Sequence, residues 1–216
     1  MKTLTQQLVE SSGGLLSPFP EVSDNTGRYS MFDDGGVEVE TGELLYGFVR
    51  VLKPERVTTT GIYTGISDMY IAQALKDNGF GHSTALEIEE THLRRAEKLW
   101  KLTGVSGYVT GILKPSLEFT PEGECEFIFL DSEPNLRFNE LIRFFPYLKP
   151  GGYFGIHDLH RHLSQVDSEH GYGWPYGPMP QEIIQWIKED KLRVVSFPTP
   201  RGLSFFYKPR EDDFRP

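Results

Sequence analysis

Two hydrophobic patterns alternate along the chain, and together they predict alternating strands and helices. Short runs rich in apolar and β-branched residues are typical of buried strands and occur at 56–60, 83–88, 107–110, 126–130 and 153–156. Longer segments with apolar residues three or four positions apart are typical of amphipathic helices and occur at 41–52, 67–76, 91–102, 136–148 and 180–189. Strands separated by helices in this way predict a parallel sheet.

The last two strand-like runs, 192–197 and 203–208, flank a short turn and are typical of an antiparallel hairpin. We therefore predict an α/β fold with a single doubly wound, Rossmann-like sheet. This sheet is mostly parallel, ends in the C-terminal antiparallel hairpin and carries helices on both faces. Residues 1–36 are polar, with one helix expected near 4–9, and we interpret them as an N-terminal extension of a domain at 37–216.

Composition and charge narrow the class of protein. The chain has 216 residues, of which 38% are hydrophobic, and this suits one α/β domain with an extension. The net charge of -9 and the lack of a basic run disfavour a nucleic-acid partner. Cys125 is the single cysteine, so we expect a buried thiol with no disulfide. We see no signal peptide and no apolar run of membrane-spanning length, and we expect a cytoplasmic protein with no membrane partner.

A glycine turn follows the first predicted core strand, and an acidic residue ends the second. Gly61 and Gly65 are four positions apart, where the chain must turn sharply into a helix that we expect Ser67 to cap. Glu87 lies about 20 residues beyond the turn, where a doubly wound fold places an acid that binds a ribose. The G-x-G-x-x-G spacing that seats a pyrophosphate is missing, so S-adenosylmethionine fits better than a dinucleotide. The alternatives are a plain turn and a solvated carboxylate.

Polar residues also end the later strands, and ligands of open α/β sheets bind outside such carboxyl ends. Asp131 follows the strand at 126–130, and His157 and Asp158 follow the strand at 153–156. For Asp131 the alternative role is an N-cap of the next helix. Four strand ends thus carry a glycine or a polar residue: Gly61, Glu87, Asp131 and the pair at 157–158. Together they indicate a ligand site more specifically than any one of them does.

Four segments resemble motifs of class I S-adenosylmethionine-dependent methyltransferases: Thr60–Ser67, Leu86–Ile88, Phe129–Asp131 and Leu148–Gly152. They occur in the family's order within residues 41–208. Within the class, they are most similar to the small O-methyltransferases of the catechol and caffeoyl-coenzyme-A type and their bacterial relatives. The resemblance implies methylation of a small hydroxylated metabolite or natural product, by a protein that forms homodimers.

The resemblance also implies roles for individual residues. The glycine loop surrounds the methionine part of the cofactor, Glu87 holds the ribose hydroxyls, and Asp131 lies near the methyl sulfonium. The cofactor-binding residues expected on this basis are Gly61, Tyr63, Gly65, Ser67, Glu87, Gly111, Ile112 and Asp131.

Three departures from the family pattern concern the chemistry. Thr59 stands where the family has an acid, so a carboxylate's attraction to the cofactor's cationic end is lost. Pro134 stands where metal-dependent members have a lysine that acts as the base. His157 and Asp158 replace an Asp-Asn pair. The first two departures suggest an alternative function, a degenerate, non-catalytic relative that binds S-adenosylmethionine.

The sequence leaves two interpretations of Asp131, His157 and Asp158 open. As metal ligands, two carboxylates suit Mg²⁺, and an added imidazole favours Mn²⁺, Fe²⁺ or Zn²⁺. As catalytic acid–base or hydrogen-bonding groups they need no metal, and His157 or His160 is then the best base.

Two expectations concern segments outside the strand ends. The aromatic, glycine-rich segment 170–178 is interpreted as a substrate lid, with a packed surface loop as the alternative. Residues 1–36 are expected to pack over the site or against a partner subunit. A nicotinamide dehydrogenase is a third candidate function, disfavoured by the missing G-x-G-x-x-G fingerprint.

Overall fold

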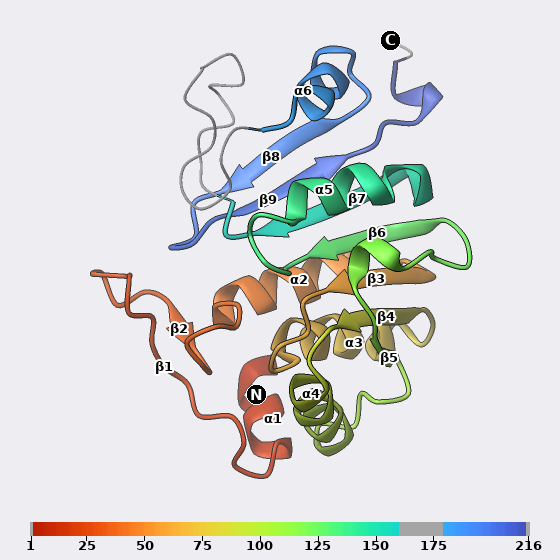
Figure 1. Ribbon diagram of the computed structural model, residues 1–216. Coiled ribbons are helices and arrows are strands. Elements are labelled where there is room, and N and C mark those ends of the chain that lie inside the picture. The colour runs from red at the N-terminus through yellow and green to blue at the C-terminus, as the bar shows by residue number, and fades with distance from the viewer. Residues whose placement is uncertain (1, 160–178, 215–216) are drawn as a thin grey trace. The chain divides into compact units, whose positions relative to one another are not determined.

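A computed structural model of the chain describes residues 2–159 and 179–214 (Figure 1). The chain divides into two compact units, residues 1–115 and 116–216. Within the described residues, no helix combines the length and apolar character needed to cross a bilayer.

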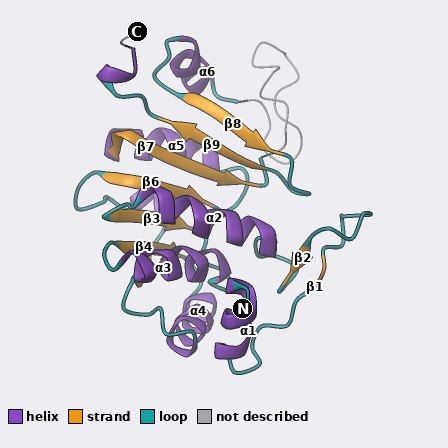
Figure 2. Ribbon diagram, turned by 180° about the vertical axis from the view of Figure 1, so that it is seen from behind, coloured by secondary structure: helices purple, strands orange, loops and turns teal. Residues whose placement is uncertain are grey.

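The first unit contains three parallel strands and the helices that connect them. Its elements are α1 (Leu4–Ser11), β1 (Phe19–Pro20), β2 (Ser30–Met31), α2 (Val39–Leu52), β3 (Arg56–Thr60), α3 (Ile66–Asn78), β4 (His82–Glu87), α4 (Glu90–Leu102) and β5 (Val109–Leu113). Strand β4 pairs in parallel with β3 on one side and with β5 on the other. Helices α2 and α3 lie side by side over these strands (Figure 2).

The start of α3 differs from the expected one. The helix begins at Ile66, and Gly65, with φ 78°, takes the capping position that we expected for Ser67. The left-handed backbone at Gly65 turns the chain into the helix one residue early, which leaves Ser67 buried in the first turn. Gly79 ends the helix in a left-handed conformation, which glycine adopts without strain.

The N-terminal segment contributes more to the core than its polar composition suggested. Thr5 of α1 donates a hydrogen bond to Glu43 of α2, and its hydroxyl lies 2.9 Å from that of Tyr70 in α3. The segment also buries four apolar side chains, those of Leu8, Leu16, Met31 and Phe32. Their burial favours a segment that folds against the rest of its unit.

In its described residues, 116–159 and 179–214, the second unit contains four strands, the last two of which form the predicted hairpin. Its main elements are β6 (Cys125–Leu130), α5 (Arg137–Phe144), β7 (Leu148–His157), α6 (Gln181–Lys188), β8 (Arg193–Phe197) and β9 (Leu203–Tyr207), with short 3₁₀ turns at Ser116–Glu118, Phe145–Tyr147 and Glu211–Phe214. Strands β6 and β7 are parallel, whereas β9 pairs antiparallel with both β7 and β8. Helix α5 covers one face of β6 and β7 (Figure 1).

Strand β7 starts earlier than the sequence pattern suggested. Residues 149–152, where the sequence predicts a sharp turn, belong to the strand, and so does Leu148, the last residue of the helix expected at 136–148, which pairs with Cys125. The register with β6 shifts between Cys125 and Phe127, while Gly151, with φ 87°, and Gly152 form backbone hydrogen bonds with Lys208. Cys125 itself is buried, as predicted. Parallel strands alternating with helices, followed by an antiparallel C-terminal hairpin, confirm the predicted fold class.

Candidate functional site

The glycine loop after β3 in the first unit has a backbone that requires glycine. Gly61 has φ 75° and donates its N–H to the carbonyl of Leu86 in β4. Gly65 has φ 78°, and a Cβ at this position would lie 2.6 Å from the Cβ of Ala96 and 2.7 Å from Nε1 of Trp100. Trp100 also donates its indole N–H to the carbonyl oxygen of Gly65. Packing against α4 therefore explains Gly65, while Gly61 aligns the loop with the end of β4.

The carboxylate of Glu87 ties this loop to the end of β4. One oxygen accepts the backbone N–H of Tyr63 at 2.8 Å, and the other accepts those of Ile88 and Glu89. Tyr63 has φ 48°, an uncommon conformation for a residue with a side chain, and it directs its N–H at the carboxylate. The structure thus brings together the glycine loop and the acid, the two features on which the cofactor hypothesis depends.

The remaining predicted cofactor residues of this unit lie on neighbouring elements. Gly111 pairs with Ala85 and Ile112 pairs with Leu86, the two residues of β4 that directly precede Glu87. A Cβ at Gly111 would lie 2.2 Å from a methyl carbon of Leu93, so close packing of α4 explains this glycine without any ligand. The structure therefore places these two residues beside the strand that carries the acid.

Asp68 was missed by the sequence analysis and lies beside Thr59, the first of the three departures. The Thr59 hydroxyl donates to Oδ1 of Asp68 at 2.5 Å, and both residues are almost fully buried. A carboxyl group thus lies next to the position where the family has its acid, but the first turn of α3 supplies it. The signal was the acidic residue directly after Ser67, which the amphipathic pattern of α3 does not explain.

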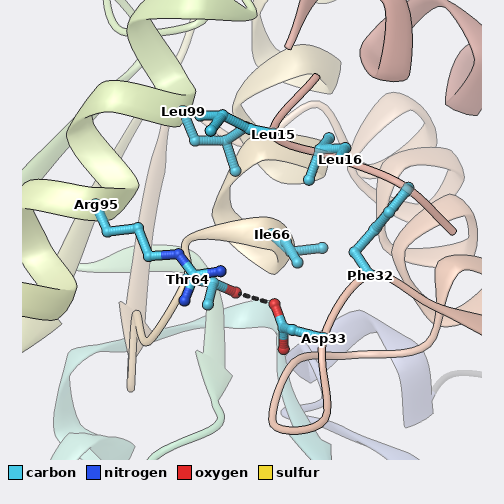
Figure 3. A pocket seen from close by; sticks show the side chains of 8 residues that line it. All are labelled: Leu15, Leu16, Phe32, Asp33, Thr64, Ile66, Arg95 and Leu99. Carbon is cyan, nitrogen blue, oxygen red and sulfur yellow. Dashed lines mark hydrogen bonds between the residues drawn. The ribbon is translucent and has the colours of Figure 1, made fainter. Parts of the chain in front are cut away.

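The N-terminal segment closes over the same loop. Asp33 accepts a hydrogen bond from the Thr64 hydroxyl at 2.6 Å (Figure 3). Gly35 lies so close to the ring of Tyr63 that a Cβ at position 35 would be 2.6 Å from a ring carbon. A small pocket forms between this segment, the loop and α4, and its lining residues are Leu15, Leu16, Phe32, Asp33, Thr64, Ile66, Arg95 and Leu99.

The second unit brings together the three residues predicted to carry the chemistry. Asp131 follows β6, His157 ends β7 and Asp158 comes next, with one potential donor atom of each within 4.8 Å of the others. Nδ1 of His157 lies 3.1 Å from Oδ1 of Asp131 and 3.5 Å from Oδ1 of Asp158. His157 is fully buried, and Asp158 has φ 58°, a strained conformation of the kind found at functional sites.

Two arginines that the sequence analysis did not single out complete this cluster. Arg137, the first residue of α5, lies 3.1 Å from Oδ1 of Asp131 through Nη2 and 3.0 Å from Oδ2 of Asp158 through Nη1. Arg201, before β9, places Nε 2.9 Å from Oδ1 of Asp158. Arg137 is the first basic residue after Asp131 in the sequence, and this was the available signal.

The charge state of Asp158 follows from these neighbours. Burial alone would raise the pKa of this carboxyl group, but His157, Arg137 and Arg201 outweigh that effect and lower the pKa of Asp158 to about 2. Asp158 is therefore ionised at neutral pH and carries a full negative charge next to the two guanidinium groups.

The donor atoms of Asp131, His157 and Asp158 are close enough to one another for a single ion, but their surroundings do not fit one. The two carboxylates already face two guanidinium groups, so a divalent cation would meet no excess negative charge. This arrangement favours the hydrogen-bonding and acid–base interpretation. His160, His162 and the predicted lid at 170–178 lie outside the described residues.

Comparisons with known proteins agree with the sequence resemblance. The model of a family described as a methyltransferase domain matches residues 59–159. Among curated proteins, none matches the sequence.

Solved structures show the same fold at low sequence identity. The O-methyltransferase TomG from Streptomyces achromogenes, involved in tomaymycin synthesis and solved with S-adenosylmethionine, is 14% identical with a TM-score of 0.64 over 97% of this chain and 92% of its own. The methyltransferase PaMTH1 from Podospora anserina, solved with S-adenosylhomocysteine, is 16% identical with a TM-score of 0.67 over 94% and 88%. An O-methyltransferase from Bacillus cereus is 16% identical with a TM-score of 0.63 over 82% and 84%. The chain therefore has the fold of these methyltransferases, and residues 59–159 are similar to the methyltransferase-domain family.

Proposed function

We propose that the protein is an S-adenosylmethionine-dependent O-methyltransferase that acts on a small hydroxylated metabolite or natural product. The observation that carries the proposal is the bond between Glu87 and the amide of Tyr63, which joins the glycine loop to a strand-end acid. Such a carboxylate suits ribose hydroxyls because an ionised carboxylate only accepts hydrogen bonds. The cofactors with which the similar proteins TomG and PaMTH1 were solved support the choice of S-adenosylmethionine.

The proposed chemistry is an in-line displacement. The acceptor oxygen attacks the methyl carbon, the carbon–sulfur bond breaks, and S-adenosylhomocysteine leaves with the electron pair on sulfur. The acceptor hydroxyl must lose its proton, and we assign this to the Asp131–His157 pair. Asp131 is the partly exposed member, and histidine is the side chain that ordinarily titrates near neutral pH. Asp131 and Asp158 both face Nδ1 of the ring, at 3.1 and 3.5 Å, and orient it.

The proposal is tested by incubating the purified protein with S-adenosylmethionine and a panel of phenols, catechols, sugars and hydroxy acids. We expect formation of S-adenosylhomocysteine together with a methylated product for one class of hydroxyl compound. Cofactor binding without turnover on any member of a broad panel would instead support the non-catalytic alternative.

Two features of the structure argue against that alternative. Asp68 supplies a carboxylate beside Thr59, and the Asp131–His157 pair supplies an acid–base group despite Pro134. Both departures from the family pattern are thus compensated by other residues. We further propose a small-molecule acceptor with no nucleic-acid or membrane partner, and a homodimeric assembly that light scattering can check.

Replacing Asp68 with asparagine is expected to weaken binding of S-adenosylhomocysteine by about 1 kcal/mol. The Thr59 hydroxyl donates its O–H to Asp68, so the hydroxyl oxygen is left as an acceptor for the cofactor's ammonium group, next to the carboxyl group of Asp68. Affinity for 5′-methylthioadenosine, which lacks that ammonium group, should not change.

Calorimetry with both ligands checks this expectation. Asp77→Asn, near the end of the same helix and exposed, is the matched control and should bind both ligands normally. Equal losses for both ligands in Asp68→Asn would assign Asp68 a purely structural role.

A further inference from the structure

Arg137 is held from several sides at the centre of the cluster formed by Asp131, His157 and Asp158. Its Nε donates to the carbonyl of Ser132 at 2.7 Å, and Nη1 donates both to the carbonyl of His157 and to the carboxylate of Asp158. Nη2 contacts the carboxylate of Asp131. All three guanidinium nitrogens are therefore engaged, although only 4% of the side chain is exposed.

A buried guanidinium is costly unless its charge and its N–H groups are matched, so this geometry is not that of a solvated surface arginine. The planar fork bridges two carboxylates that come from the ends of two different strands. Helix α5 begins at Arg137, so the backbone of the residue is fixed by the start of a helix. The guanidinium of Arg137 is thus a fixed component of the site.

The charges of the cluster are balanced within the second unit. Asp131 and Asp158 supply two negative charges, and Arg137 and Arg201 supply two positive ones. A divalent cation coordinated by both carboxylates would have to displace Arg137 from them and leave its buried charge unmatched. Removal of Arg137 would have the opposite effect, because it leaves two carboxylates, an imidazole and a space between them.

We propose that the guanidinium of Arg137 takes the place of a divalent cation at this site, so that the reaction is metal-independent. This inference deepens the proposed function, because it assigns how the Asp131–His157–Asp158 cluster works with a cation supplied by the chain itself. Arg137 acts as a positioning residue, which holds the two carboxylates around the imidazole.

The test is a titration of Mn²⁺ into the apo protein, followed by electron paramagnetic resonance, which needs no acceptor and no turnover. The wild-type protein should show no saturable binding that depends on Asp158. Arg137→Ala should bind Mn²⁺ at least about tenfold more tightly than wild type, since two carboxylates then face only the single guanidinium of Arg201. The double variant Arg137→Ala with Asp158→Asn should lose that gain.

A control variant accompanies the titration, and a second measurement on the wild-type protein keeps the inference testable if Arg137→Ala does not fold. Arg143→Ala, also in α5 but bonded to Phe119 and Thr120, is the matched control and should bind Mn²⁺ no better than wild type. Turnover of the wild-type protein, once an acceptor is known, should persist in excess EDTA.

Saturable Mn²⁺ binding by the wild type that is lost in Asp158→Asn would overturn the inference. So would loss of turnover in EDTA that Mn²⁺ restores. Lack of turnover with every acceptor would count against the proposed function alone, because the Mn²⁺ titration is independent of it.

Discussion

Replacing Glu87 with alanine is expected to weaken binding of S-adenosylhomocysteine by about 1.5–3 kcal/mol, the scale of a hydrogen bond to a charged group. The carboxylate is 7% exposed and is oriented by the backbone amides of Tyr63, Ile88 and Glu89. Its oxygens are thereby fixed as acceptors for the ribose hydroxyls. Isothermal titration calorimetry of the wild type and the variant measures the difference.

The same substitution also removes the bond that holds the glycine loop, so loss of ribose contact must be separated from loss of loop order. A 2′-deoxy analogue of S-adenosylhomocysteine makes this distinction. The analogue should bind the wild type more weakly than the parent compound does, whereas Glu87→Ala should bind both compounds alike. Glu89→Ala, at an exposed neighbouring position, is the control. A full loss of affinity on deoxygenation in both proteins would show that Glu87 does not contact the ribose.

Much of the fold could be predicted because its signals are local in the sequence. Strand β3 was predicted with the bounds that the structure shows, since a β-branched run between Pro54 and Gly61 has few alternatives. Helix ends were less predictable: Ser67 has the side chain of an N-cap, but the left-handed turn at Gly65 starts α3 before it. Similarly, residues 149–152 resemble a turn in the sequence but belong to β7, because Gly151 and Gly152 form backbone hydrogen bonds with Lys208, which is distant in the sequence.

In the candidate site, too, residues with a local sequence signal could be predicted, whereas residues whose partners are distant in the sequence could not. Strand-end positions predicted that Asp131 and His157 lie together, since parallel neighbours end at the same edge of a sheet. Arg137 could not be assigned in the same way, because it lies on a helix and meets Asp158 across 21 positions of the chain. Asp68 was missed because its partner, Thr59, lies on the preceding strand, and side-chain pairing across a turn leaves no periodic pattern.

Residues near the glycine loop also show that position alone does not establish a role. Gly65 and Gly111 are both explained by close packing against α4, with Trp100 and Leu93 as their neighbours. Neither glycine therefore argues for a cofactor by itself. Glu87 is the stronger argument for a cofactor site. Its carboxylate accepts hydrogen bonds from three backbone amides at the end of a strand, and close packing does not require such an arrangement.

Replacing His157 with glutamine is expected to lower the turnover number by about 10²–10⁴-fold, the usual contribution of general acid–base catalysis. Glutamine is close to histidine in size and keeps a hydrogen-bonding group near Asp131, so the buried position should remain filled. It cannot take up a proton near neutral pH, and this is the property under test. Binding of S-adenosylhomocysteine should stay within about twofold of wild type, because Tyr63 and Glu87, the proposed cofactor-binding residues, are untouched.

The dependence of turnover on pH distinguishes a base from a structural residue. If the Asp131–His157 pair takes the proton, the dependence of turnover on pH should change shape in His157→Gln. Asp131→Asn should lower turnover as well, since it removes the carboxylate that lies 3.1 Å from Nδ1 and orients the ring. His82→Gln, at an exposed position of β4, is the control and should behave like wild type. An unchanged pH profile in His157→Gln would assign deprotonation of the acceptor to another group and leave His157 as a packing residue.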